Sequence, residues 1–97
     1  MTDIALVAFD QFGGNRAMVM LGGRASITRE GDLIVSFKMC KKASLMRIRY
    51  DKGSDTYVMA FGRYTGHEVV YSDTISGLYA EDLRDCFESY TGLRTAL

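Results

Sequence analysis

The sequence predicts a small α+β domain: an antiparallel four- to five-stranded β-sheet with an N-terminal and a C-terminal helix packed on one face. Three observations predict it. Apolar and polar residues alternate through the middle of the chain, which is the period of half-buried strands. Short glycine-containing turns separate these runs, as in hairpins. From Tyr79 to Tyr90 the apolar spacing becomes helical, so a helix follows the strands.

The first helix is expected over Ile4–Phe12, with Thr2 or Asp3 as its N-terminal cap. Its apolar stripe consists of Ile4, Ala8 and Phe12, widened by Val7 and Phe9. Gly13-Gly14 is expected to end it, because glycine readily adopts the left-handed conformation found at helix C-termini.

Two strands are expected next. The apolar run Ala17–Leu21 (AMVML) reads as a short buried strand closed by Gly22-Gly23, with possible pairing near Ser26–Thr28. The stretch Leu33–Met39 has the clearest alternation, and its odd-numbered residues are the more apolar. We therefore expect Leu33, Val35, Phe37 and Met39 to face the core.

The stretch Leu45–Tyr64 predicts a hairpin, because two alternating runs flank the polar loop DKGSD. In its first strand Arg47 and Arg49 share one face, opposite Met46, Ile48 and Tyr50. In its second strand the core face consists of Tyr57, Met59 and Phe61, since these side chains carry most of the apolar area.

The last elements follow a turn predicted at Tyr64-Thr65-Gly66-His67. A strand over Glu68–Ile75 is expected to turn Val69, Tyr71 and Ile75 inward. The final helix is expected to bury a face made of Tyr79, Leu83, Cys86, Phe87 and Tyr90 and to end at Gly92.

Length and composition are those of one globular domain over residues 1–97, with 47% hydrophobic and 25% charged residues. No apolar run reaches the roughly 18 residues that a membrane span needs. The N-terminus lacks the basic leader and cleavage pattern of a signal peptide. Cys40 and Cys86 are far apart in sequence and suggest reduced structural thiols. We therefore expect a cytoplasmic protein without a membrane partner.

The net charge is zero, but the charges are segregated along the chain. Residues 16–63 hold ten of the twelve lysines and arginines and four acids, whereas residues 64–97 hold two arginines and six acids. A dedicated nonspecific DNA binder is usually strongly basic, so zero net charge argues against that class. A local basic patch is compatible with the count.

Several short motifs occur in order along nearly the whole chain. They are GGNR at 13–16, SFK at 36–38, TY at 56–57 leading to FG at 61–62, GLYAEDLR at 77–84 and TGL at 91–93. The set resembles a family of small, mostly uncharacterised proteins of tailed bacteriophages and prophages. The resemblance implies a phage origin and a bacterial cytoplasm, and it assigns no active site.

No pattern predicts catalysis, a metal or a cofactor. His67 is the single histidine, with no cysteine nearby in sequence, whereas a metal site needs several donors. Glu81, Asp82, Asp85 and Glu88 fall on the polar side of the last helix and read as a solvated face. The Gly-Gly-Asn-Arg segment lacks the spacing of a phosphate-binding loop. We expect a protein without enzymatic activity.

A basic sheet face is the feature that suggests a function. Its candidate nucleic-acid-binding residues are Lys38, Lys41, Lys42, Arg47, Arg49, Arg63 and Tyr64. Cations with an aromatic ring on an open sheet suit single-stranded nucleic acid, because bases stack and phosphates pair with cations. The alternative is that these cations only keep an exposed face soluble and protect the sheet edges. Tyr50, Tyr57 and Phe61 are expected to face the core, so they would not add aromatic rings to this basic face.

Two functions follow from the sequence. The first is a non-catalytic phage-type accessory protein that binds single-stranded DNA or RNA through the basic face, as a possible homodimer that extends it. The second is a protein-interaction module that inhibits or redirects a host protein, for example a defence complex, using the acidic last helix or a strand edge. The order of strands before a helix is also similar to single-stranded-DNA-binding transcriptional coactivators, a likeness of fold alone.

Overall fold

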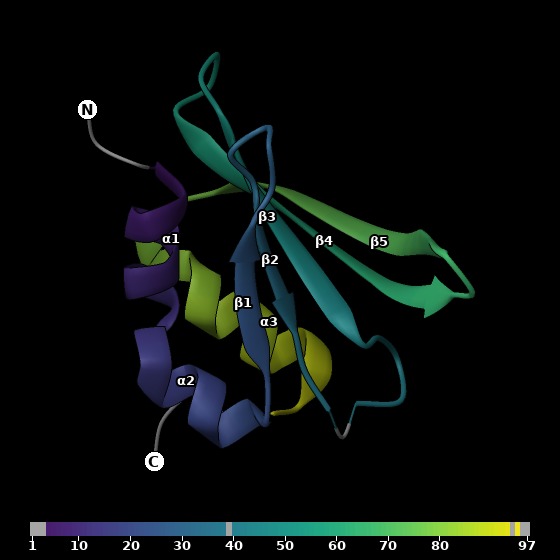
Figure 1. Cartoon of the computed structure of the whole chain (residues 1–97). Helices are drawn as coiled ribbons and strands as arrows, with labels where there is room; N and C mark the ends of the chain where they lie inside the picture. Colours follow the sequence, from purple (N-terminus) through teal and green to yellow (C-terminus); the bar gives the residue numbers. More distant parts are fainter. Residues whose placement is uncertain (1–3, 39, 94, 96–97) are drawn as a thin grey trace.

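The structure of the chain is a computed structural model that describes residues 4–38, 40–93 and 95. Its elements are α1 (Ile4–Phe12), α2 (Gly14–Leu21), β1 (Arg24–Ile27), β2 (Leu33–Ser36), β3 (Leu45–Asp51), β4 (Thr56–Thr65), β5 (Glu68–Leu78), the 3-10 turn η1 (Ala80–Asp82) and α3 (Leu83–Thr91). The strands form one antiparallel sheet in the order β1-β2-β3-β4-β5. Figure 1 shows the three helices gathered on one side of it. The predicted α+β class is confirmed.

The N-terminal part holds two helices, where one helix and a strand were predicted. The bounds of α1 are as predicted, and Gly13 with φ 125° turns the chain after Phe12. The prediction of a buried strand at Ala17–Leu21 is wrong, because this run lies in α2. Ala17 and Leu21, one helical turn apart, are buried, while Val19 between them is 82% exposed. The expected caps Thr2 and Asp3 and the side chain of Ile4 lie outside the described residues.

The core lies between the helices and one face of the sheet. The predicted inward residues Leu33, Val35 and Phe37 are buried, and Phe37 lies just past the end of β2. Met39 lies outside the described residues. The core also takes up the predicted inward side chains of the hairpin, which are Met46, Ile48, Tyr57, Met59 and Phe61, with Tyr50 partly buried against it. The alternation in the sequence therefore identified the core face of the central strands.

The C-terminal helix closes this core. The Phe87 ring is fully buried and meets the rings of Phe12 and Phe37 edge-on, with centroids 4.9 and 5.1 Å away. Gly92 ends α3 in the left-handed conformation, as predicted. Tyr79 was expected on the buried helix face, and this is wrong: its side chain is 59% exposed. The reason is that η1 separates it from α3, so the helical register does not extend back to it.

Strand β5 departs from the predicted alternation. It contains two register shifts against β4, one between the pairs Tyr57/Leu78 and Met59/Ile75, the other between Phe61/Asp73 and Gly62/Tyr71. Each shift adds a residue on β5 and moves the following side chains to the other face. Ile75 packs against the core as predicted. The prediction that Tyr71 points inward is wrong, because the second shift reverses its direction.

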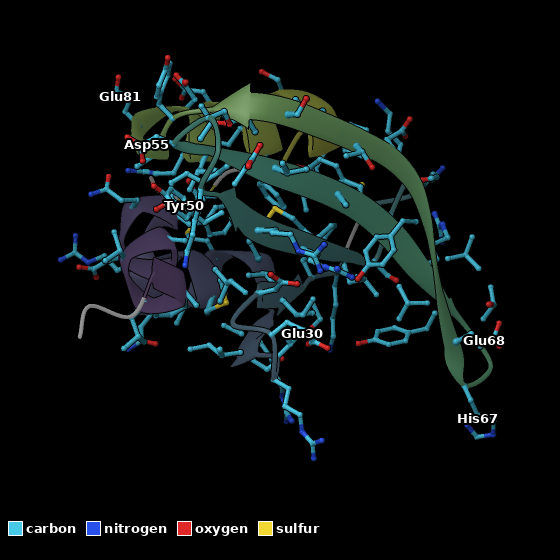
Figure 2. All side chains as sticks on the ribbon, turned by 90° about the horizontal axis from the view of Figure 1, so that it is seen from above. Glu30, Tyr50, Asp55, His67, Glu68 and Glu81 are labelled. Atoms are coloured by element: carbon cyan, nitrogen blue, oxygen red, sulfur yellow. The ribbon has the colours of Figure 1, made fainter. Side chains whose placement is uncertain are left out.

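The far half of the β4–β5 hairpin projects beyond the helices (Figure 1). Figure 2 shows His67 and Glu68 at its tip, away from the helices. The predicted turn over residues 64–67 is shorter than expected, because β4 continues to Thr65 and the turn is Gly66-His67. Val69 was expected inward, and this is wrong: it is exposed on this projecting arm. The tip is therefore a two-stranded ribbon with solvent on both sides.

Candidate nucleic-acid interface

The helices leave one face of the sheet uncovered, and β3 projects its two arginines there. Met46 and Ile48 face the core, so the alternating residues Arg47 and Arg49 take the opposite face, as predicted. Their neighbours on β4 are small: Arg47 pairs with Ala60 and Arg49 with Val58. Two long cationic side chains therefore lie next to small apolar side chains on the neighbouring strand.

A shallow depression of about 230 Å³ lies on this face. We call it the arginine depression; its lining residues are Arg47, Arg49, Val58, Ala60, Tyr71 and Thr74. It is smaller than the roughly 300–1,000 Å³ that small-molecule sites typically occupy. Its shape suits one flat group lying against the sheet better than an enclosed ligand.

One buried carboxylate holds both arginines. Asp32, 4% exposed, lies just before β2. Its Oδ2 is 3.0 Å from Nε of Arg47 and 2.8 Å from Nη2 of Arg49, and Nε of Arg49 donates to both carboxylate oxygens at 3.1 Å. The hydrogen bond to Asp32 and the attraction of its charge raise the pKa of Arg49 above its ordinary value. The three groups together carry a net charge of one positive unit.

The second register shift brings an aromatic ring to the arginines. The guanidinium carbon of Arg47 lies 5.5 Å from the ring centroid of Tyr71, within the range of a cation–π contact. Tyr71 reaches this position because it pairs with Gly62, whose missing side chain leaves room for the ring. Unbroken alternation along β5 would have turned Tyr71 inward, so the sequence pattern did not indicate it as an interface residue.

Hydrogen-bonding capacity remains on both guanidinium groups. Among the residues that the structure describes, the polar contacts of Arg47 use Nε, and those of Arg49 use Nε and Nη2. Both terminal nitrogens of Arg47 and Nη1 of Arg49 have no hydrogen bond to these residues. Because a guanidinium carries five N–H donors, the depression retains donors for an anionic ligand.

The other predicted interface residues are dispersed. Lys38 is not in the sheet ladder: β2 ends at Ser36, and the Lys38 side chain lies beside Gly22 at the C-terminus of α2. The Lys42 ammonium lies 5.0 Å from the Tyr90 ring centroid, next to α3 on the helix-covered side. Lys41 is exposed in the loop between β2 and β3. These lysines do not join the arginine depression.

Two further predicted residues lie on the projecting arm. Arg63 and Tyr64 are exposed on β4, opposite Val70 and Val69 of β5. Strand alternation from Gly62 puts Tyr64 on the same face as Tyr71 and puts Arg63 on the other. Of the seven predicted residues, the structure therefore brings Arg47 and Arg49 together and adds Tyr64 farther along the same face.

An apolar groove lies at the β1 edge of the sheet, between α1 and β1. Its volume is about 180 Å³, and its lining residues are Leu6, Phe9, Ala25, Ser26, Ile27 and Leu33. All four residues of β1 are exposed, and one edge of this strand has no partner within the sheet. The groove thus combines apolar side chains with a strand edge that no other strand of the described residues covers.

Groups suited to catalysis are dispersed. Cys40 and Cys86 are free thiols, and burial, followed by the charge of Asp82, raises the pKa of Cys86. His67 is exposed at the hairpin tip. In the described part of the chain, His, Cys, Asp and Glu nowhere gather in a group of three able to hold a metal ion. Nor does this part contain a helix with the length and apolar character needed to cross a membrane.

Comparisons with protein-family models, with curated proteins and with solved structures each find no match for this chain. The chemistry of the chain's own residues, above all those of the arginine depression, is therefore what indicates a function.

Proposed function

We propose that the protein binds single-stranded DNA or RNA across the open face of its sheet, as a non-catalytic accessory protein. One observation carries the proposal: the register shift in β5 sets Tyr71 beside Arg47 on that face. It brings a half-buried aromatic ring to the two arginines, where strand alternation had predicted none. With Arg49 and its unused donors, this arrangement offers a stacking surface and a cationic contact within one depression.

Single strands suit this surface better than a duplex. Unpaired bases expose flat faces that stack on aromatic rings or on guanidinium planes, whereas a duplex hides them. The small side chains of Val58 and Ala60 leave space for a base beside Tyr71. Arginine binds phosphate oxygens through paired N–H donors, which suits the adjoining backbone. Tyr64 lies farther along the same face for a second base.

The charge of the protein limits this binding. The net charge is zero, and Asp32 neutralises part of the local positive charge. We expect two or three phosphate contacts. Each phosphate contact with a single strand contributes roughly −0.7 to the slope of the logarithm of the binding constant against the logarithm of the salt concentration, so the expected slope is about −1.4 to −2.1. Binding should accordingly be measured at low ionic strength.

The test is fluorescence anisotropy with a labelled thymidine or uridine oligonucleotide. Replacing Tyr71 with Ala should cost about 1–3 kcal/mol of binding free energy, the usual worth of one stacked base. The matched control is Tyr79→Ala, which removes an exposed ring outside the depression. The proposal fails if excess protein does not bind at low salt, or if both variants bind like the unmodified protein.

The biological setting is part of the same proposal. The resemblance to phage and prophage proteins supports a phage origin and a role in the bacterial cytoplasm. A homodimer would extend the binding face over a longer strand. Sedimentation with and without oligonucleotide tests the oligomeric state: a monomer throughout contradicts the dimer and leaves the binding proposal intact.

A second candidate function, binding of a host protein, is favoured by the groove beside β1. An extended segment of a partner can pair with an unpaired strand edge while its apolar side chains enter an adjoining groove. Exposed Arg24 and Arg29, in β1 and just after it, suit acidic residues on that segment. The test is recovery of a one-to-one protein partner from host lysate. Loss of this partner with Ile27→Asp, and its retention with Val19→Asp at an exposed position in α2, would support this function. Equal loss on both would argue against it.

A further inference from the structure

We propose that Asp32 is a positioning residue: it orients the guanidinium groups of Arg47 and Arg49 so that the arginine depression accepts one unpaired nucleotide. This inference rests on the proposed function. The nucleotide's phosphate would contact the arginines, and its base would lie against Tyr71. Asp32 is therefore expected to strengthen the binding of an anion although it is itself an anion.

The position of Asp32 is fixed by its own backbone. Its N–H donates to Oγ1 of Thr28 at 3.0 Å, and its carbonyl oxygen accepts from the Thr28 N–H at 2.8 Å. These two bonds close the turn that leads from β1 into β2, where the next residue, Leu33, is buried. The carboxylate is thus built into the sheet, which is what a residue that orients others requires.

Its contacts restrict how the two arginines can point. Arg49 meets the carboxylate through Nε and Nη2, a two-point contact that fixes the plane of its guanidinium group. Arg47 has two contacts: its Nε forms an ion pair with Asp32 at 3.0 Å, and its guanidinium carbon lies over the ring of Tyr71. Without these contacts both side chains would be flexible, and ordering them on binding would cost free energy.

The donors that remain lie on the same two groups. Arg47 meets Asp32 through Nε as an ion pair, both of its terminal nitrogens have no hydrogen bond to the described residues, and neither does Nη1 of Arg49. A phosphate has several acceptor oxygens, so it can bind these donors while Asp32 keeps its own contacts. The carboxylate therefore need not be displaced when an anion binds.

Two opposite expectations for Asp32→Asn make the inference testable. If only charge mattered, removing the carboxylate would make the face more positive, and an oligonucleotide would bind more tightly and with a steeper salt dependence. If Asp32 positions the arginines, the same change releases them, and binding weakens. Asn is close to Asp in size, so the change acts mainly on charge and hydrogen bonding.

The experiment measures anisotropy of a labelled thymidine oligonucleotide at low salt with the unmodified protein, Asp32→Asn and the control Asp85→Asn. The control makes the same change of charge at an exposed position on α3. We expect Asp32→Asn to bind roughly tenfold more weakly, the usual worth of a lost charge-assisted contact, and the control to bind at least as tightly as the unmodified protein. Restored affinity in Asp32→Glu would confirm the role of the carboxylate.

The outcomes separate this inference from the proposed function. If the unmodified protein binds and Asp32→Asn binds equally or more tightly, the positioning role is overturned and nucleic-acid binding stands. If the unmodified protein does not bind at all, both are overturned. Should Asp32→Asn not fold by circular dichroism, Thr28→Val replaces it, because it removes the hydroxyl that holds the Asp32 backbone and leaves both arginines unchanged. Weaker binding then supports positioning, and unchanged binding overturns it.

Discussion

Replacing Gly62 with Ala tests the register shift on which the candidate interface depends. A Cβ atom at this position would lie 2.6 Å from the carbonyl oxygen of Val70, and 3.0 and 3.1 Å from Cδ1 and Cα of Tyr71. The nearest of these atoms belongs to the backbone of β5, so a side-chain rotation cannot relieve the clash. The two strands would have to separate locally or the ring of Tyr71 would have to leave the face.

The expected loss follows from this overlap. Overpacking a well-packed site typically costs about 1–3 kcal/mol. For a domain of this size each kcal/mol lowers the melting temperature by roughly 4–8 °C, so a fall of about 4–24 °C is expected. An unshifted ladder with Tyr71 turned inward predicts the opposite sign, since Ala in an ordinary strand position is about 0.5–1 kcal/mol more favourable than Gly.

Thermal unfolding followed by circular dichroism measures the difference. The matched control is Gly53→Ala, since a Cβ atom there would meet one side-chain oxygen of Asp51 at 3.4 Å, an ordinary contact. We expect the control to change stability by about 0.5 kcal/mol or less. A Gly62→Ala protein that is as stable as the control, or more stable, would refute the register shift and with it the outward placement of Tyr71.

Three further predictions concern the core and the titrating groups. Phe87→Ala should cost about 3–5 kcal/mol in urea unfolding because the ring is fully buried, against about 0.5 kcal/mol for exposed Tyr79→Ala; equal costs would contradict the packing. The hydrogen bond from the Tyr90 hydroxyl to Asp73 raises the pKa of Tyr90 in the folded protein. Its contribution to folding stability is therefore complete below the ordinary tyrosine pKa near 10, and it is lost as the pH rises through the higher pKa of the folded state. Asp73→Asn should therefore shift the tyrosine absorbance titration to lower pH, and an unchanged titration would exclude this bond. Burial raises the pKa of Cys86, so iodoacetamide should react with it more slowly in the folded chain than in urea, and equal rates would contradict its burial.

The central strands were predictable because burial of one sheet face forces a period of two. Leu33, Val35 and Phe37 could face the core only as a set, and the hairpin over Leu45–Tyr64 followed from the same rule. Glycine marked the end of α3 for a local reason, since Gly92 adopts a positive φ of 76°. These features depend on neighbouring residues in the sequence, which a single sequence displays directly.

The second helix was not predictable from its own residues. The five apolar residues Ala17–Leu21 are compatible with a short buried strand and equally with a little more than one turn of helix. The choice depends on tertiary packing: Ala17 and Leu21 enter the core beside Phe12, and Val19 is left in solvent. A strand would have buried all the odd-numbered residues of the run. Only the position of α1 and of the sheet decides between the two.

The candidate interface was predictable in part. Alternation in β3 sufficed to put Arg47 and Arg49 on the open face. Asp32 lies 17 residues before Arg49, and no local pattern connects a turn carboxylate with a strand that pairs later. Glycines inside a strand are a known sign of bulges, so Gly62 and Gly77 were signals for the two shifts in β5.

The helix layer and the open face are connected through the segment of β5 between its two register shifts. Ile75 packs against the core, and Asp73 accepts a hydrogen bond from Tyr90 of α3, so this segment is held on the helix side. The strand crosses the edge of the core at the second shift, and there Tyr71 must turn to the other face. The same contacts that close the core therefore determine where the ring meets Arg47. On this account the aromatic part of the interface is a consequence of packing on the opposite side of the sheet, which explains why a pattern of surface residues alone did not reveal it.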